Sequence, residues 1–276
     1  MIYLTSQNFK EYELLDTGAG ERLERWGNVI LRRPDPQIIW ERHQPNALWE
    51  DVHAHFNEKW DIKKPLPEPW LLDFENIKLL AKLTNFKHTG VFPEQSANWE
   101  WLAQKGAKRV LNLFAYTGAA TIVLAKQGCL VTHVDASKPA LDWAAENQKL
   151  NGLLSDSIRW MLDDAVKFVK REVRRGAQYD GILLDPPSFG HGPSGKLWKF
   201  NEDLPGLLAD CAALLSPDAK FLLINGYATN SSPLALKNLL EDVMKGRPGT
   251  IEYGELCLTQ KDWRMISTGI FSRWSP

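Results

Sequence analysis

The sequence predicts an α/β fold, with a doubly wound and mostly parallel sheet that follows a small β-rich N-terminal domain. From residue 110 to residue 243, short apolar runs bounded by turn residues alternate with helical patterns. This alternation is expected when helices connect parallel strands. The first 62 residues instead contain short strand patterns separated by glycine and proline turns, which is typical of antiparallel structure.

The bulk composition limits the classes of protein that fit. A chain of 276 residues that is 44% hydrophobic can bury a sizeable core in one large domain or two small ones. The net charge of −1 argues against unspecific coating of nucleic acid, although a local basic patch is compatible with it. The three cysteines form no CxxC pair, so we expect no metal site and no disulfide framework. Without a spanning apolar run or a signal-peptide pattern, we expect a cytoplasmic protein that does not enter membranes.

The N-terminal region is predicted to be an antiparallel meander. Its strands flank a glycine-rich turn at residues 18–20, and KKPLPEPW at residues 63–70 reads as a proline-rich linker. The next segment, residues 70–83, is predicted to form two strands, with one short helix as the alternative. We therefore expect an N-terminal domain at 1–62, a linker with connecting strands at 63–85 and the main domain at 86–276.

The main domain is predicted element by element from caps and apolar spacing. Helices are expected to begin near Pro93, Ala119, Ser137, Ala165 and Glu202, because N-cap residues, prolines or turn residues precede their apolar stripes. Buried strands are expected between them. The predicted order is a helix at 93–106, a strand from 110, a helix from 119, a strand ending at 135, a helix at 137–150, a strand at 157–162, a helix from 165, a strand ending at 185, a glycine- and proline-rich loop, a helix at 202–215, a strand at 219–226, a helix through 243, and two strands near 251–258 and 265–274.

Two features at predicted strand ends suggest a nucleoside-binding crevice. The turn from Phe114 to Gly118 contains small residues that permit close approach of a ligand to the backbone, although it could be a plain structural turn. Asp135 ends the following strand, where a carboxylate can accept hydrogen bonds from both hydroxyls of a ribose. The alternative is that Asp135 caps the next helix. Asp164, or its neighbour Asp163, is placed to reach an adenine edge, with an N-cap as the alternative role.

The strongest signal is Asp185-Pro186-Pro187-Ser188-Phe189 at the end of the fourth strand. Two prolines fix the backbone and remove two N–H donors, so carbonyl and carboxylate oxygens can accept hydrogen bonds from a substrate amino group. Phe189 can stack on the face of a base. The alternative is a proline-terminated strand followed by a core phenylalanine.

Taken together, these motifs resemble class I S-adenosylmethionine-dependent methyltransferases. They resemble most the group that includes the bacterial 23S ribosomal-RNA large-subunit methyltransferases I and K. The segments that carry the resemblance are FAYTG at 114–118, VDAS at 134–137, ENQKLNG at 146–152, DA at 164–165, DPPSF at 185–189 and, with two departures at Pro93 and Glu94, TGVFPEQ at 89–95.

The resemblance implies a seven-stranded Rossmann-like sheet with a reversed last strand, and S-adenosylmethionine as cofactor. The predicted catalytic residues are Asp185, Pro186, Pro187 and Phe189. The predicted cofactor-binding residues are Gln95, Asn112, Phe114, Ala115, Tyr116, Thr117, Gly118, Asp135, Ala136, Ser137, Asn151, Asp163, Asp164 and Ala165. The implied substrate is a base in RNA, specifically ribosomal RNA.

One departure from the family bears on the mechanism. Members that methylate carbon-5 of cytosine carry a cysteine after the fifth strand, whereas this chain reads INGYATNSS at 224–232. We therefore expect direct methyl transfer to nitrogen, in preference to oxygen, without a cysteine nucleophile. His191 is a weak candidate base, and Lys196, Trp198 and Lys199 could grip RNA or simply form an exposed loop. Two other functions are considered, a nicotinamide-dependent oxidoreductase and a noncatalytic cofactor-binding module. The sequence does not predict the oligomeric state.

Overall fold

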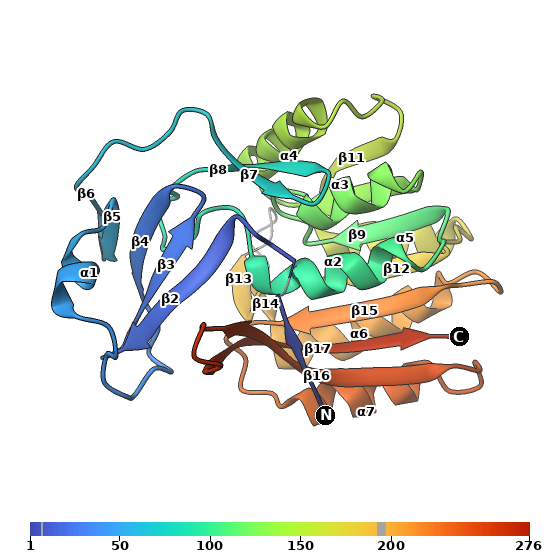
Figure 1. The fold of residues 1–276 in the computed structure, drawn as a ribbon. Helices are drawn as coiled ribbons and strands as arrows, with labels where there is room; N and C mark the ends of the chain where they lie inside the picture. Colours follow the sequence, from blue (N-terminus) through green and yellow to red (C-terminus); the bar gives the residue numbers. More distant parts are fainter. Residues whose placement is uncertain (7, 192–196) are drawn as a thin grey trace. The chain divides into compact units, whose positions relative to one another are not determined.

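A computed structural model describes residues 1–6, 8–191 and 197–276 (Figure 1). The chain divides into two units. Unit 1 comprises Met1–Leu4, Asn98–Leu256 and Ser267–Pro276, and unit 2 comprises Thr5–Ala97 and Cys257–Ile266. The predicted domain boundaries 1–62, 63–85 and 86–276 remain predictions.

Unit 1 is built around an eight-stranded sheet in the order β1-β16-β17-β15-β12-β9-β10-β11. Strands β15, β12, β9, β10 and β11 run parallel, and β17 runs antiparallel to β15, which confirms the predicted doubly wound fold with a reversed strand. The strands that lie wholly or mostly in unit 1 are β1 (Ile2–Thr5), β9 (Arg109–Leu113), β10 (Leu130–Asp135), β11 (Ile158–Leu162), β12 (Gly181–Leu184), β13 (Phe189–His191), β14 (Leu197–Lys199), β15 (Phe221–Gly226), β16 (Thr250–Thr259) and β17 (Met265–Ser275). The helices are α2 (Ser96–Ala103), α3 (Ala119–Lys126), α4 (Lys138–Leu150), α5 (Ala165–Arg174), α6 (Phe200–Ala213) and α7 (Pro233–Val243).

The sheet contains one strand more than the seven predicted. The extra strand is β1, which lies beside β16 at the edge of the sheet. Its partner carries Gly254, and the backbone of Ile2 approaches this glycine so closely that no Cβ would fit between them. The pairing joins segments about 250 residues apart in the chain, so no local pattern in the sequence predicts it.

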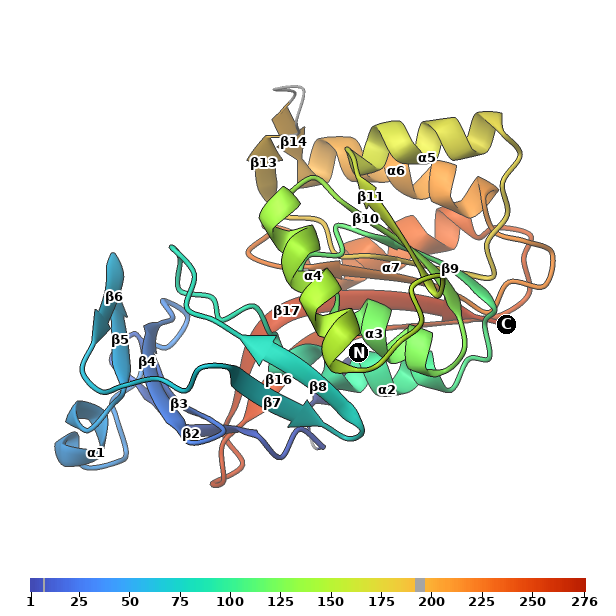
Figure 2. The same cartoon turned by 90° about the horizontal axis from the view of Figure 1, so that it is seen from above.

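Helices cover both faces of the sheet, with α5, α6 and α7 on one face and α2, α3 and α4 on the other (Figure 2). The first face forms a continuous apolar core. Its fully buried residues include Ile182 and Leu184 from β12, Leu222 from β15, and Leu208 from α6. Burial of such side chains stabilises each by roughly 1.5–3 kcal/mol relative to exposure in water. The predicted apolar runs therefore do form the centre of the sheet.

The segment after β12 differs from its prediction. The sequence indicates a loop, whereas β13 and β14 pair as a short antiparallel hairpin with Phe189 opposite Lys199. The remainder of the predicted loop, residues 192–196, lies outside the described residues.

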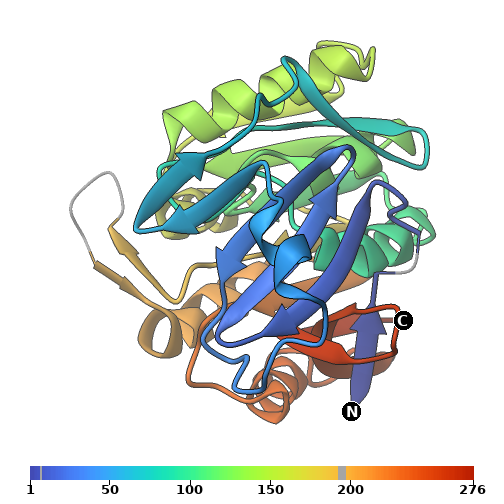
Figure 3. The same ribbon diagram turned by 60° about the vertical axis from the view of Figure 1, so that its left-hand side comes forward.

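Unit 2 contains a five-stranded sheet in the order β2-β3-β4-β5-β6 and a separate hairpin of β7 and β8 (Figure 3). The predicted meander is confirmed for β2, β3 and β4, while β5 joins parallel to β4. The two strands predicted after the linker are also confirmed. The elements are β2 (Tyr12–Gly18), β3 (Glu21–Trp26), β4 (Val29–Pro34), α1 (Asn46–Glu50), β5 (Ala54–Asn57), β6 (Lys59–Ile62), β7 (Trp70–Phe74), β8 (Ile77–Ala81) and a 3₁₀ turn at Pro93–Gln95.

A charged cluster is buried in the sheet of unit 2. Glu24 is fully buried, and Arg33 donates to both of its carboxylate oxygens over 2.6 and 2.7 Å. Tyr12 donates its hydroxyl to the same carboxylate over 2.7 Å, and Arg22 lies 3.7 Å from it. Burial alone would raise the pKa of Glu24, but Arg33 and Arg22 outweigh it and hold the pKa at about 2.

Candidate active site

Four parallel strands of unit 1 end at the same edge of the sheet. The register pairs Leu113 of β9 with Val134 of β10 and with Leu184 of β12, and it pairs Asp135 with Leu162 of β11. The segments that follow these strands are 114–118, 135–137, 163–165 and 185–189. The structure thus brings most of the predicted site residues to one edge, where open parallel sheets bind their ligands.

The turn after β9 is the most strained segment of this edge. Phe114 and Tyr116 have positive φ angles of 55° and 49°, and Gly118 has a φ angle of 81°. Non-glycine residues rarely adopt this conformation, and strain of this kind gathers at binding sites. Gly118 is also required by packing, because an added Cβ would lie 3.0 Å from the Cβ of Ala144 in α4. The turn therefore exposes backbone in a fixed shape at the start of α3.

Asp135 faces this strained turn. One carboxylate oxygen accepts a hydrogen bond from the backbone N–H of Tyr116 over 2.8 Å, and the other accepts one from Ser137 over 2.8 Å. Each carboxylate oxygen has two acceptor sites, so both oxygens retain capacity for a ligand hydroxyl. Burial raises the pKa of Asp135 above its ordinary value of 3.8, and the backbone hydrogen bonds oppose this only in part. Among the described residues, no cationic side chain forms an ion pair with it.

A polar network behind the turn holds it in place. Asn147 of α4 donates its amide N–H to the carbonyl of Thr117 over 2.9 Å. Asn112 donates to Thr121 over 2.9 Å, and the hydroxyl of Thr121 lies 2.9 Å from Nδ1 of His133. The side chain of Asn112 is thus engaged inside unit 1, and its predicted contact with the cofactor remains a prediction.

The sequence did not single out Asn147 as a site residue. Its only signal is its place in the ENQKLNG segment, where Asn151 was selected instead. Asn151 follows α4 and donates its amide N–H to the carbonyl of Asn147 over 2.7 Å. Asn151 therefore contributes indirectly to the turn, because it hydrogen-bonds to Asn147, whose side chain in turn holds Thr117.

The two acids after β11 both have local partners. Asp164 is the N-cap of α5, and its Oδ1 accepts from the backbone N–H of Lys167 over 2.9 Å. Asp163 accepts from the N–H of Asp164 over 2.8 Å and forms an ion pair with Arg171. Ala165 begins the helix and is buried. The capping role considered for Asp164 is therefore present, and any contact of either acid with adenine remains a prediction.

The Asp-Pro-Pro segment follows β12 at the same edge. Asp185 is half-buried, Pro186 is buried, and Phe189 exposes 59% of its surface. The exposed phenylalanine argues against the alternative that it belongs to the core. The backbone N–H of Asp185 donates to the carbonyl of Leu113 over 3.3 Å, which ties this segment to the strand beneath the strained turn.

The β13–β14 hairpin is fastened to this segment by Trp198. Its indole N–H donates to the carbonyl of Pro187 over 2.7 Å, and its ring lies 5.3 Å from that of Phe114. Trp198 is 8% exposed, so the interpretation of this residue as an RNA contact or as part of an exposed loop is wrong. Lys199 forms a 2.9 Å ion pair with Glu202, and Lys196 lies outside the described residues.

A sequence model described as an S-adenosylmethionine-dependent methyltransferase family matches residues 35–250 of the chain. This protein is a member of that family. The match confirms the predicted family, and it agrees with the nucleoside-binding features at the edge of the sheet. S-adenosylmethionine is therefore the cofactor, as predicted.

Individual methyltransferases support this assignment. The crystal structure of an S-adenosylmethionine-dependent methyltransferase from Agrobacterium tumefaciens has a TM-score of 0.95 and 40% identity, and the match covers 100% of this chain and 94% of that one. The ribosomal RNA large subunit methyltransferase I of Aeromonas salmonicida is 36% identical over 44% of this chain and 31% of its own length. The methyltransferase K/L of a Shewanella species is 34% identical over 66% of this chain and 27% of its own length.

This methyltransferase-family chain thus spans about a third or less of the curated ribosomal-RNA methyltransferases that it matches. The alternative of a nicotinamide-dependent oxidoreductase receives no support from the family match or from these relatives. Across the residues that the structure describes, no helix has both the length and the apolar character needed to cross a membrane.

The residues at the edge fit the cofactor of the methyltransferase family. The acceptor sites that remain on Asp135 are suited to the hydroxyls of a ribose, and the left-handed turn at Gly118 permits close approach of a nucleoside to the backbone. Gln95 belongs to unit 2, where it is buried in the 3₁₀ turn, and its predicted cofactor contact remains a prediction. The neighbours Ala136 and Ser137 continue from Asp135, and Ser137 caps α4.

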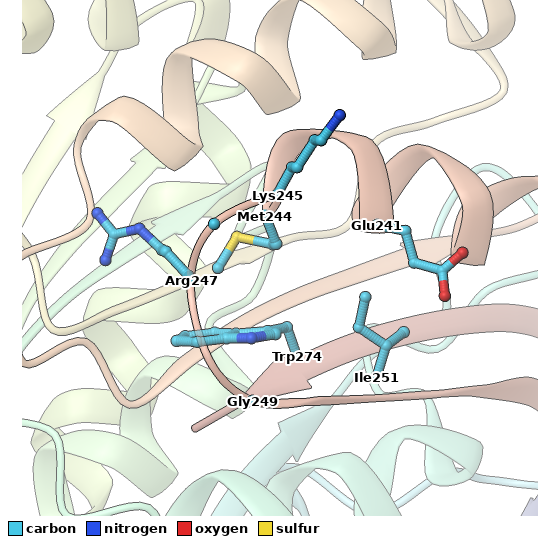
Figure 4. Close-up of a pocket in the computed structure, with 8 residues that line it drawn as sticks. Glu241, Met244, Lys245, Arg247, Gly249, Ile251 and Trp274 are labelled. Atoms are coloured by element: carbon cyan, nitrogen blue, oxygen red, sulfur yellow. The ribbon is translucent and has the colours of Figure 1, made fainter.

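One hollow in the methyltransferase fold lies away from these residues. It has a volume of about 270 Å³ and lies between the end of α7 and the start of β16 (Figure 4). Trp274, Met244 and Arg247 are among its lining residues, and Trp274 pairs with Leu222 near the start of β15. The hollow is therefore at the opposite end of the parallel strands and contains no predicted site residue.

Proposed function

We propose that this protein is a cytoplasmic enzyme that methylates a base in ribosomal RNA, with S-adenosylmethionine as methyl donor. The observation that carries the proposal is the shared edge of the sheet, where the strained turn and Asp135 lie beside the Asp185-Pro186-Pro187 segment. The names of the relatives from Aeromonas and Shewanella favour ribosomal RNA as the substrate.

In this proposal, the turn and Asp135 hold the nucleoside part of the cofactor. The backbone from Phe114 to Gly118 lies against the nucleoside, and the carboxylate of Asp135 accepts hydrogen bonds from the ribose hydroxyls. Asn147 keeps the turn rigid through its bond to Thr117. Asp163 and Asp164 shape the adenine end through the start of α5. The cofactor itself supplies an electrophilic methyl group on a positively charged sulfur.

The Asp-Pro-Pro segment then orients the nucleophile. Asp185 would accept a hydrogen bond from the amino group of the base. As the base nitrogen bonds to the methyl carbon, the C–S bond to that carbon would break and S-adenosylhomocysteine would leave as a neutral thioether. Asp185 would then receive the proton that the nitrogen loses. Pro186 and Pro187 keep the backbone fixed, and the exposed ring of Phe189 stacks on the base. Positioning of the two reactants supplies most of the rate enhancement, since effective molarities of oriented groups reach about 10⁵–10⁸ M.

The environment of the cysteines supports a mechanism without a thiolate. Cys129, Cys211 and Cys257 are all buried. Burial raises the pKa of Cys129 to about 11. It also raises the pKa of Cys211, which α6 places in the apolar core, well above its ordinary value. A thiol that stays protonated and enclosed is a poor nucleophile, so each Cys→Ala variant that folds should retain methyl transfer.

The decisive experiment compares ribosomal RNA from cells with and without the gene. We expect mass spectrometry of the nucleosides to show one methylated base that disappears with the gene and returns with the wild-type copy. An Asp185→Asn copy should fail to restore it, while an Asp156→Asn copy, changed at an exposed loop residue, should restore it. Identical nucleosides in both strains, and no label transferred from S-adenosylmethionine to any RNA by the purified protein, would overturn the proposal.

A further inference from the structure

The turn between β16 and β17 presents a tryptophan to solvent. Trp263 exposes 84% of its surface, and the turn that carries it belongs to unit 2 (red in Figure 1). Lys261 in the same turn and Met265 at the start of β17 are also exposed. The ring of Trp263 is therefore not part of the core and is accessible to a ligand.

The turn is ordered by hydrogen bonds rather than by the tryptophan. Gln260 donates its backbone N–H to Arg264 over 2.8 Å, and Trp263 donates its backbone N–H to Gln260 over 3.0 Å. The φ angle of Trp263 is 68°, which suits glycine or asparagine better than a bulky residue. The fold thus keeps an aromatic ring at a position where a small residue would be less strained.

Side chains of unit 2 hold the turn from below. Gln260 donates to Asp16 over 3.3 Å and accepts a hydrogen bond from Thr17. The indole N–H of Trp40 donates to the carbonyl of Thr17 over 3.1 Å. The exposed ring is therefore carried on a preorganised support, which reduces the entropy lost when a ligand stacks on it.

Cationic side chains lie in the same turn as Trp263, and one of them contacts the support of the turn. The guanidinium carbon of Arg264 lies 5.7 Å from the centre of the Trp40 ring, and its Nη2 lies 3.0 Å from Nε2 of His43. Among the described residues, Arg264 forms no ion pair with a carboxylate. Asp262 accepts from the backbone N–H of Arg264 and pairs with His43, so its charge is engaged within the turn and its support. Lys261 forms an ion pair with Glu13 over 2.6 Å, and its side chain is 85% exposed.

We propose that Trp40, His43, Lys261, Trp263 and Arg264 form a contact site for single-stranded RNA, named here the Trp263 patch. One base stacks on Trp263, and the adjoining phosphates lie near Arg264 and Lys261. An exposed ring beside a cation that has no carboxylate partner matches the alternation of bases and phosphates along a single strand. The inference rests on the proposed function, because it assigns to the RNA substrate a contact outside the carboxyl edge of the sheet in unit 1.

The test measures RNA binding by the full chain with two variants of Trp263. Fluorescence anisotropy follows a labelled single-stranded RNA of about twelve nucleotides, a length within the usual range for one such binding site. Trp263→Asn removes the ring and suits the left-handed backbone, whereas Trp263→Tyr keeps an aromatic face. Phe86→Asn is the matched control, because Phe86 is another exposed aromatic residue of unit 2, with 71% of its surface exposed.

We expect Trp263→Asn to weaken RNA binding about tenfold or more, as loss of one stacked base predicts. Trp263→Tyr and Phe86→Asn should bind within about threefold of wild type. The melting temperature of Trp263→Asn should equal or exceed that of wild type, because the ring supports no core. Equal affinity of wild type and Trp263→Asn, an equal loss in Phe86→Asn, or no RNA binding by the wild-type chain would each overturn the proposal.

Separate measurements distinguish this inference from the proposed function. The affinity of Trp263→Asn for S-adenosylhomocysteine should equal that of wild type, and its KM for RNA should rise with little change in kcat. RNA binding that depends on Trp263, in a protein that methylates no RNA, would refute the proposed function and uphold the patch. Methylation with an unchanged KM in Trp263→Asn would uphold the function and refute the patch.

Discussion

A buried carboxylate and a half-buried one are held in opposite ways in this protein. Glu24 in unit 2 has two arginines and a tyrosine around it, and its pKa is held at about 2 despite burial. The carboxylate of Asp135 in unit 1 accepts hydrogen bonds from the backbone N–H groups of Tyr116 and Ser137, and burial raises its pKa. The carboxylate of Glu24 is fully occupied by side chains of the fold. The carboxylate of Asp135 instead keeps free acceptor sites, and its charge is poorly compensated.

The difference separates a structural carboxylate from a binding one. A buried charge whose partners are all built into the fold contributes to stability, or at least depends on those partners. A carboxylate held by two N–H donors at a strand end stabilises the fold little, and it gains its remaining hydrogen bonds only from a ligand.

The largest expected effect is on stability, in Glu24→Gln. Loss of the charge leaves the buried Arg33 without its carboxylate partner and leaves Arg22 with the more distant Asp35, at 3.9 Å. We therefore expect the free energy of unfolding to fall by about 3–5 kcal/mol. Chemical denaturation followed by circular dichroism measures this change. Glu58→Gln, an exposed glutamate in the turn between β5 and β6, should stay within about 0.5 kcal/mol of wild type. A similarly small change in Glu24→Gln would mean that the cluster adds little to the fold.

The second effect is on binding, in Asp135→Asn. The amide keeps the shape of the side chain but loses the charged acceptor, so we expect affinity for S-adenosylhomocysteine to fall by about 1.5–3 kcal/mol. The free energy of unfolding should change by less than about 1 kcal/mol, because among the described residues no cationic partner of Asp135 would be left unpaired. Calorimetric titration measures the affinity, with Asp156→Asn as control. A large loss of stability with unchanged affinity would reverse the assignment of Asp135 as a binding carboxylate.

The sequence predicted the fold of unit 1 nearly element by element, because strand and helix patterns there are local. Ser137 and Asp164 cap helices α4 and α5 at the predicted positions. What local patterns could not reveal are pairings between distant segments. Strand β1 joins the sheet beside β16, and Asn147 reaches from α4 to a carbonyl of the strained turn.

The same limit explains the wrong interpretation of Trp198. A tryptophan among lysines and glycines resembles an exposed loop residue, and only the pairing of β13 with β14 turns its N–H toward Pro187. The position of the candidate site was predictable because parallel strands place their carboxyl ends together, whereas burial of individual rings depends on tertiary packing.

The smallest expected effect is the pH dependence, which should have opposite signs for the two carboxylates. The pKa of Glu24 is lowered in the folded protein, from 4.5 to about 2. Its contribution to stability is therefore present above about pH 4.5 and is lost as the pH falls toward 2. The pKa of Asp135 is raised above 3.8, so protonation of Asp135 stabilises the folded state, and this stabilisation is lost as the pH rises through the raised pKa.

Cofactor binding should report Asp135 separately from the stability of unit 2. Because the ionised carboxylate is the better acceptor, affinity for S-adenosylhomocysteine should decline as the pH falls through the raised pKa of Asp135. In Asp135→Asn this part of the decline should be absent, and weak binding should persist with a flatter profile. Calorimetric titrations between about pH 4.5 and pH 8, the range in which Glu24 stays ionised, make this comparison. Parallel profiles for wild type and variant would show that the carboxylate of Asp135 does not contact the cofactor, and the contrast with Glu24 would then be one of burial alone.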